Sequence, residues 1–184
     1  MKDKHLIEKC LETEPIFKGR LLDIHRDRVR LPNDSESTRE YTRHPGAVAM
    51  VPLLPDGRIM LIRQFRYPVR KVMIELPAGK LDPGEDYLTT APRELEEEIG
   101  YRAGEFILLG EIDPCVGYSD EHMWICLARD LTATTNNLDR DEFLEALPVS
   151  LPEAVRMATD GTITDVKTII GILWAERYLS RKAR

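Results

Sequence analysis

The residues best suited to chemistry stand in one segment between Gly79 and Tyr101, GKLDPGEDYLTTAPRELEEEIGY. On a helix, Glu94 lies within one turn of both Glu97 and Glu98, so three carboxylates share one face. Like charges at these spacings repel one another, and a nearby cation is needed to offset them. Magnesium takes carboxylate oxygens and completes its shell with water and substrate phosphates. The alternative is that the glutamates only form a solvated helix face.

The spacing of the whole segment separates these two interpretations. It follows the pattern G-x5-E-x7-R-E-U-x-E-E-x-G-U, where U is aliphatic, and therefore resembles the Nudix box. Tyr101 is aromatic where the pattern ends on an aliphatic residue, a position whose role is packing. The fixed positions are filled by Gly79, Glu85, Arg93, Glu94, Glu97, Glu98 and Gly100.

Segments outside the box resemble the ADP-ribose pyrophosphatase branch of the Nudix superfamily, over most of residues 16 to 178. One departure is Val116, which stands where the branch usually has a proline directly before the glycine of the loop after the box. The resembling segments are Arg43–Leu53, Leu61–Tyr67, Glu75–Gly79, Gly117–Glu121 and Asp165–Thr168.

The resemblance implies a divalent cation, Mg²⁺ or alternatively Mn²⁺, that joins the enzyme to a diphosphate. Glu94 and Glu98 match the main metal ligands, with Glu97 close by and the backbone carbonyl of Ala78 joining them. Arg93 and Glu85 match residues that support this geometry, and an arginine near several carboxylates can hold one in place. A bound metal would also explain how an acidic protein handles a polyanionic substrate.

The resemblance also implies substrate-binding residues, for which simpler roles remain open. Arginines on strands beside the site match positions that hold the substrate, although solubility of a strand surface is the alternative. Phe17 could stack on a base or pack in the core, and Glu121 could contact metal or the distal sugar. The full set is Arg43, Arg63, Arg66, Phe17 and Glu121.

A separate carboxylate is needed to orient or deprotonate the attacking water if the box glutamates hold metal. In the resembling branch this residue comes from a loop after the box, which corresponds here to Thr132–Phe143. Glu142 is our choice over Asp139 and Asp141, because a longer side chain at the end of the loop reaches further. The alternative is that these acids only solvate a surface loop.

Short strands and helices must position these groups, and the apolar pattern predicts where they run. Two antiparallel strands are expected within Ile16–Arg43 around the turn Pro32–Ser35, and Ala47–Leu54 is expected to form a hairpin with Ile59–Tyr67. Further strands are predicted at Val72–Leu76, Phe106–Ile112 and Met123–Ala128, and a loop at Thr132–Asp141.

Helices are predicted by their caps and their apolar spacing. The box helix should end before Gly100 and begin at an N-cap Thr89 or Thr90, which would place Pro92 in the first turn. Ser150 and Glu153 fit a capping box ahead of a short helix that ends near Gly161. A last helix follows from the apolar residues Val166, Ile169, Ile170, Leu173, Trp174 and Tyr178.

Composition excludes several other classes of protein. The chain has 184 residues, 42% of them hydrophobic and 32% charged, which fits one globular domain. Its formal net charge of −6 argues against a general nucleic-acid surface. No apolar run is long enough for a membrane span, and the charged N-terminus lacks a signal core. Three cysteines without a C-x-x-C pair favour the reducing cytoplasm.

These elements predict a mixed α/β fold, and the resemblance implies a three-layer α/β/α sandwich with a mixed β-sheet and N-terminal antiparallel strands. We expect residues 1–45 to form strands that make a homodimer, because such short strands have little core of their own. Residues 46–184 are expected to form the Nudix hydrolase domain.

The activity implied by the resemblance is hydrolysis of the diphosphate linkage of ADP-ribose or a related nucleoside diphosphate sugar. The implied partners are this small molecule and a second copy of the chain, with no nucleic acid and no membrane. One alternative is a house-cleaning enzyme for modified nucleoside triphosphates, against which Arg43–Leu53 and Arg63–Tyr67 argue. A more distant alternative is a non-catalytic ADP-ribose sensor, against which the intact box argues. The sequence does not choose the base or the sugar.

Overall fold

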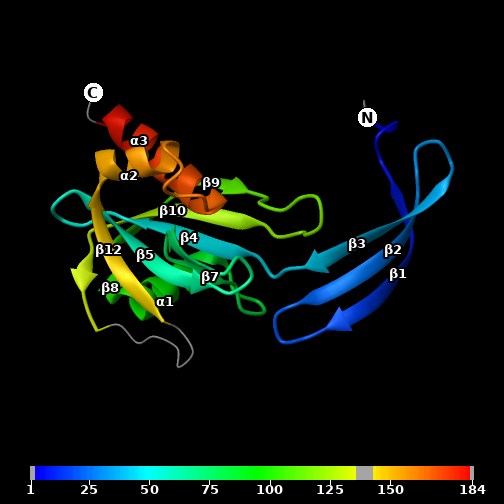
Figure 1. Cartoon of the computed structure of the whole chain (residues 1–184), viewed down its shortest axis with the longest axis horizontal. Coiled ribbons are helices and arrows are strands. Elements are labelled where there is room, and N and C mark those ends of the chain that lie inside the picture. Colours follow the sequence, from blue (N-terminus) through cyan, green and yellow to red (C-terminus); the bar gives the residue numbers. More distant parts are fainter. Residues whose placement is uncertain (1–2, 136–142, 183–184) are drawn as a thin grey trace. The chain divides into compact units, whose positions relative to one another are not determined.

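Two compact units make up the chain in the computed structural model, which describes residues 3–135 and 143–182 (Figure 1). One unit comprises Met1–Pro45 and Cys115–His122, and the other comprises Gly46–Pro114 and Met123–Arg184. Within these described residues, no helix is long and apolar enough to cross a membrane.

The unit of Met1–Pro45 and Cys115–His122, called the N-terminal unit below, contains an antiparallel sheet in the order β1–β2–β3. The two strands expected within Ile16–Arg43 are confirmed as β2 and β3, which pair directly across a turn. A third strand, β1, was not predicted, because it is exposed along its whole length and lacks regular apolar alternation. The strands are β1 (Lys9–Lys18), β2 (Asp23–Arg30) and β3 (Glu36–Arg43).

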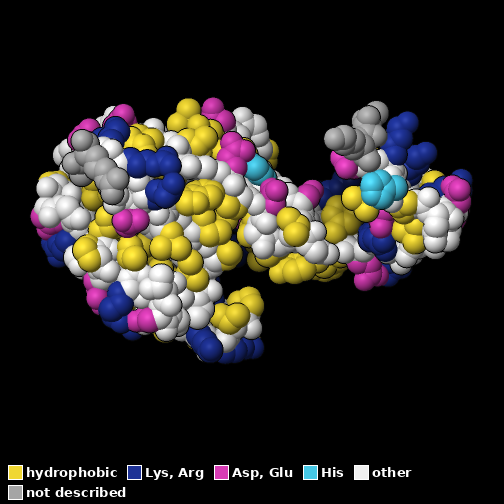
Figure 2. Space-filling view, turned by 90° about the horizontal axis from the view of Figure 1, so that it is seen from above, with side chains coloured by type: hydrophobic (Ala, Val, Ile, Leu, Met, Phe, Trp, Pro, Cys, Tyr) yellow, Lys and Arg dark blue, Asp and Glu magenta, His cyan; other side chains and the backbone are white. Residues whose placement is uncertain are grey.

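The surface of the N-terminal unit combines charge pairs with exposed apolar side chains. Arg26 pairs with Glu40 at 2.8 Å and Arg28 with Glu36 at 2.9 Å, each across β2 and β3. Figure 2 shows hydrophobic side chains on the surface of this unit. Those at least 38% exposed are Leu6, Ile7, Leu11, Ile16, Phe17, Leu21, Leu22, Val116 and Tyr118.

The second unit contains two larger sheets and one short strand pair. A mixed sheet has the order β7–β4–β10–β9, in which only β4 and β10 are parallel. An antiparallel sheet has the order β12–β5–β6, and β8 pairs with β11. The strands are β4 (Ala47–Pro52), β5 (Arg58–Arg66), β6 (Lys71–Glu75), β7 (Ala78–Lys80), β8 (Tyr101–Arg102), β9 (Glu105–Ile112), β10 (Met123–Arg129), β11 (Thr132–Ala133) and β12 (Leu144–Ser150).

The predicted hairpin between Ala47–Leu54 and Ile59–Tyr67 is wrong. Both strands form, but they enter different sheets. Across the turn they share an isolated antiparallel bridge between Leu53 and Ile59 and a hydrogen bond from the Leu54 N–H to Arg58 at 2.8 Å. β4 instead pairs in parallel with β10, a partner far along the chain that local patterning cannot reveal. The predicted loop at Thr132–Asp141 is also wrong at its start, because Thr132–Ala133 forms β11.

Helices cover both faces of these sheets, as Figure 1 shows, with α1 on one side and α2 and α3 on the other. β4 is buried on both faces, since alternate residues of a strand point to opposite sides. Val48 and Met50 pack in the cluster that contains Leu95 of α1, whereas Val51 packs in the cluster that contains Ile172 of α3. The mixed α/β, three-layer prediction is confirmed. The helices are α1 (Tyr87–Ile99), α2 (Leu151–Thr159) and α3 (Val166–Lys182).

The box helix α1 ends as predicted but begins earlier. Gly100 caps its C-terminus in the left-handed conformation at φ 68°, which a glycine adopts without steric cost. Its N-cap is Asp86, whose side chain accepts from the Thr89 N–H at 2.8 Å, so a cap at Thr89 or Thr90 is wrong. Pro92 therefore lies in the second turn, and it has no N–H to donate to the preceding turn.

The C-terminal helices begin at the predicted signals. Ser150 is the N-cap of α2, and its hydroxyl accepts from the Glu153 N–H at 3.3 Å. The last helix, α3, begins at Val166, where Asp165 accepts from the Thr168 N–H at 3.0 Å. Both helices therefore start where the sequence predicts.

Candidate functional site

Box residues reach one place because β7 and α1 are close in sequence and in space. Gly79 lies in β7, Glu85 lies in the connection that follows, and Arg93 to Glu98 lie on α1. β7 is an edge strand held by antiparallel pairing of Ala78 with Ala49 of the buried strand β4. The mixed sheet thus supplies a rigid base on which the carboxylates of α1 are arranged.

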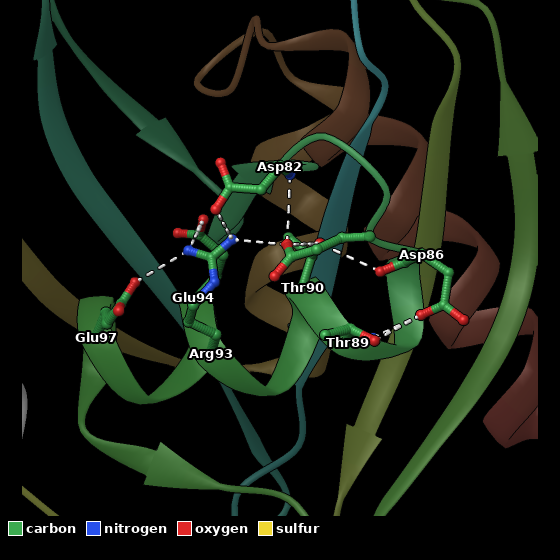
Figure 3. A network of polar contacts seen from close by, with 8 residues as sticks. Asp82, Asp86, Thr89, Thr90, Arg93, Glu94 and Glu97 are labelled. Carbon is green, nitrogen blue, oxygen red and sulfur yellow. Dashed lines mark hydrogen bonds and ion pairs between the residues drawn. The ribbon is translucent and has the colours of Figure 1, made fainter.

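Arg93 lies at the centre of three box carboxylates (Figure 3). Its Nη1 donates to Glu94 at 2.8 Å and to Glu97 at 3.3 Å, and its Nη2 donates to Glu85 at 3.2 Å. Partial burial lowers the pKa of Arg93, but the charge of Glu94 and the hydrogen bond to Glu85 outweigh it and raise the pKa overall. The arginine supplies a positive charge that offsets the repulsion expected between these glutamates.

Glu85 is fixed before the helix begins. Its carboxylate accepts from the Thr90 hydroxyl at 2.9 Å and from the Asp82 N–H at 3.3 Å, besides its bond with Arg93. These hydrogen bonds, that of Thr90 first, hold the pKa of Glu85 below its ordinary value. Glu85 therefore stays ionised at neutral pH and orients Arg93.

Glu98 and Glu94 both lie against the backbone of β7. Glu98 is 4% exposed, and its carboxylate accepts from the Ala78 N–H at 3.1 Å. A Cβ atom at position 79 would overlap the Glu94 carboxylate, so a larger residue there would displace the Glu94 side chain from its present position. The glycine of the box thus lets a carboxylate approach the strand that carries Ala78.

The chemistry of these donors fits a hard divalent cation. Glu94, Glu97 and Glu98 offer carboxylate oxygens, of which one from Glu98 lies at the backbone of Ala78, and magnesium and related ions prefer oxygen ligands. Among residues 3–135 and 143–182, no three His, Cys, Asp or Glu side chains already converge as a ligand cluster. Substrate phosphates and water commonly supply the remaining ligands of such an ion.

The two arginines predicted from β5 each pair with a glutamate. Arg66 donates from Nε and Nη2 to Glu75 of β6, at 2.7 and 2.8 Å. Arg63 donates to Glu145 of β12 at 2.5 Å, in an exposed pair. Both arginines belong to the same unit as the box.

The other predicted substrate-binding residues come from a different unit than the box. Arg43, Phe17 and Glu121 belong to the N-terminal unit. A hydrogen bond to Tyr41 is the main cause that raises the pKa of Arg43. Phe17 is 54% exposed, and Glu121 lies 4.0 Å from the His44 Nε2.

Glu142, the predicted catalytic base, lies outside the described residues, as do its alternatives Asp139 and Asp141.

Sequence reasoning missed a buried polar network that lies next to the box. Glu75 at the end of β6 contacts Lys167, which comes from the first turn of α3. The signal was present, because Lys167 and Thr168 occupy the buried stripe of α3 where apolar residues are expected. A charged residue in such a stripe is almost always paired.

Comparison with known proteins decides the family. Residues 43–169, more than half of the chain, match the family model described as NUDIX domain. The chain belongs to the Nudix hydrolase family. Residues 8–42 match a second model, the nucleoside diphosphate sugar hydrolase N-terminal domain. Nudix hydrolases use a divalent metal, in agreement with the donor set on α1.

Relatives of this Nudix chain match it along nearly all of its length. An ADP-ribose pyrophosphatase from Bacillus subtilis is 38% identical over 175 residues, which cover 94% of this chain and 95% of that protein. A methanol dehydrogenase activator from Bacillus methanolicus is 39% identical over 171 residues, 92% of each chain. The crystal structure of an ADP compounds hydrolase superposes with a TM-score of 0.86 at 23% identity, covers 96% of both chains and confirms the fold.

Proposed function

We propose that this Nudix enzyme hydrolyses the diphosphate linkage of ADP-ribose or a related nucleoside diphosphate sugar. The products would be a nucleoside monophosphate and a sugar phosphate. The similarity to the Bacillus subtilis ADP-ribose pyrophosphatase, at 38% identity over 94% of this chain, carries the proposal. The N-terminal match at residues 8–42 supports a nucleoside diphosphate sugar as substrate class. The three free cysteines fit the cytoplasm, which we propose as its compartment.

Mg²⁺ is the metal that we propose for the site, held by Glu94, Glu97, Glu98 and the Ala78 carbonyl. When bound, it would supply positive charge to offset that of the leaving phosphate and to activate a water molecule. Arg93, which bonds Glu94 and Glu97, keeps these carboxylates in place during the reaction.

Residues outside the box would bind the two ends of the substrate and the attacking water. We assign Arg63 and Arg66 to the diphosphate, because guanidinium groups match phosphate oxygens in charge and geometry. Arg43, Phe17 and Glu121 are assigned to the nucleoside and the distal sugar. Glu142 is assigned as the base that takes the proton of the attacking water.

The function is tested by incubating the protein with a panel of nucleoside diphosphate sugars and nucleoside triphosphates, in Mg²⁺ or Mn²⁺. We expect AMP and ribose 5-phosphate from ADP-ribose, identified by chromatography, and loss of the reaction when a chelator removes the metal. Faster release of pyrophosphate from nucleoside triphosphates would instead identify a house-cleaning enzyme. Binding of ADP-ribose without turnover would identify a sensor.

A homodimer built largely by residues 1–45 belongs to the same proposal. Exposed apolar side chains of the N-terminal unit, such as Leu11 and Ile16, support it, because contiguous exposed apolar surface marks an interaction site. Light scattering at micromolar concentration is expected to give the mass of two copies. Leu11→Glu and Ile16→Glu should lower it to one copy, whereas Leu173→Glu on α3, 37% exposed, should not. A fully active wild-type monomer would contradict the proposal.

A further inference from the structure

A network of four charges, of which Glu75 and Lys167 are buried, joins the end of β6 to the start of α3. Glu75, only 2% exposed, accepts two hydrogen bonds from Arg66, at 2.7 and 2.8 Å. Lys167, 8% exposed, contacts the same carboxylate and also donates to Asp165 at 3.0 Å. Two cations and two carboxylates therefore balance, and this balance is what makes the burial of charges tolerable.

The strand that carries Glu75 is also held by hydrogen bonds that do not involve the Glu75 carboxylate. The backbone of β6 pairs with β5 in the register Ile62 to Glu75. The next residue, Leu76, donates its N–H to the Thr168 hydroxyl at 2.8 Å, and that hydroxyl in turn donates to Asp165 at 2.5 Å. The backbone that leads from β6 to Ala78 is therefore held by hydrogen bonds in which the Glu75 side chain takes no part.

Glu75 holds Arg66 through only part of its guanidinium group. Its Nε and Nη2 make the bidentate pair, which leaves Nη1 outside the pair, and its side chain is 44% exposed. The hydrogen bond to Glu75 is the main cause that raises the pKa of Arg66, and the charge of Glu98 adds to it. Arg66 therefore lies within electrostatic reach of the box.

We propose that Glu75 is a positioning residue for substrate binding, an inference that rests on the proposed function. A bidentate pair fixes the plane of a guanidinium. An arginine without such a pair loses side-chain conformational entropy when substrate binds, and this loss weakens binding. Glu75 holds Arg66 in one orientation, and Lys167 holds Glu75 through Oε2, the same oxygen that the Arg66 Nη2 contacts. The remaining donors of Arg66 are then preorganised for the oxygens of a diphosphate.

The test is a double-mutant cycle on Arg66 and Glu75, read as KM and kcat for ADP-ribose. Glu75→Gln should raise KM about tenfold and change kcat by less than about threefold, because it removes an interaction that acts on binding. In an Arg66→Ala background the same change should raise KM by less than about twofold, because its target is gone. Equal effects in both backgrounds, or a loss confined to kcat, would overturn the inference.

Two further variants keep this test decisive. Thr168→Val loosens the same network without touching Arg66, so it should lower the melting temperature while its effect on KM stays additive with Arg66→Ala. Glu75→Asp retains the charge but is one carbon shorter, and it should also raise KM if Glu75→Gln fails to fold. A normal KM in both Glu75 variants rejects the inference. A wild-type protein that does not hydrolyse ADP-ribose rejects the proposed function instead.

Discussion

Glu98→Gln is expected to lower kcat for ADP-ribose hydrolysis by about 10²–10³-fold while leaving the fold intact, since the site acts through charge stabilisation. Glu98 is buried against β7, and its carboxylate accepts from the Ala78 N–H. Glutamine has nearly the same shape, and its carbonyl oxygen can accept the same hydrogen bond. The substitution removes the negative charge that we propose holds the metal. Turnover in saturating Mg²⁺ and the circular dichroism melting curve measure the two effects separately.

Glu96→Gln provides the matched control on the same helix. Unlike Glu94 and Glu97, which bond Arg93, the Glu96 side chain accepts from Arg102 at 2.9 Å and also bonds Thr134. An exposed pair of this kind contributes little to stability. We expect its turnover within about twofold of wild type, because Glu96 is not among the carboxylates proposed to hold the metal. A Glu98→Gln enzyme that works near the wild-type rate in saturating Mg²⁺ would show that the metal assignment is wrong.

The parts of the site that could be predicted from sequence are those encoded by local spacing. A helix that ends at Gly100 must place Glu94, Glu97 and Glu98 within one turn of one another, and the structure has this arrangement. Arg93 follows from the same spacing, since Glu97 is four residues further along. N-caps such as Ser150 can likewise be predicted from the sequence, because an N-cap bonds a backbone group only three residues away.

What could not be predicted depends on contacts between distant residues. The pairing of β4 with β10 joins segments that are separated in sequence by the whole box. The residues of neither strand indicate which strand it pairs with. Lys167 lies 92 residues beyond Glu75, so the sequence alone did not show that the two would meet. The prediction of the N-cap of α1 failed for a different reason. Asp86, Thr89 and Thr90 are all residue types that can cap a helix. In the structure Asp86 accepts from the Thr89 N–H, and the Thr90 hydroxyl bonds Glu85 instead.

The last prediction concerns the base, which we propose to be Glu142. The residue lies outside the described part of the chain, but the segments on either side of it are anchored near the site. Before it, the Thr134 N–H donates to Gly100, the C-cap of α1, at 2.7 Å. After it, Leu144 of β12 pairs with Gln64 of β5, between Arg63 and Arg66. The described residues that precede and follow 136–142 therefore lie beside the end of the box helix and beside the strand that carries both arginines.

Glu142→Gln should lower kcat by about 10²-fold or more, the usual effect of losing a general base, and change KM little. Asp139→Asn and Asp141→Asn are matched controls within the same segment, and each should keep nearly normal turnover. If one of them loses activity while Glu142→Gln does not, the segment supplies the base but we have chosen the wrong residue. If all three variants keep normal turnover, the proton of the attacking water goes to a box glutamate instead, and this segment has no chemical role.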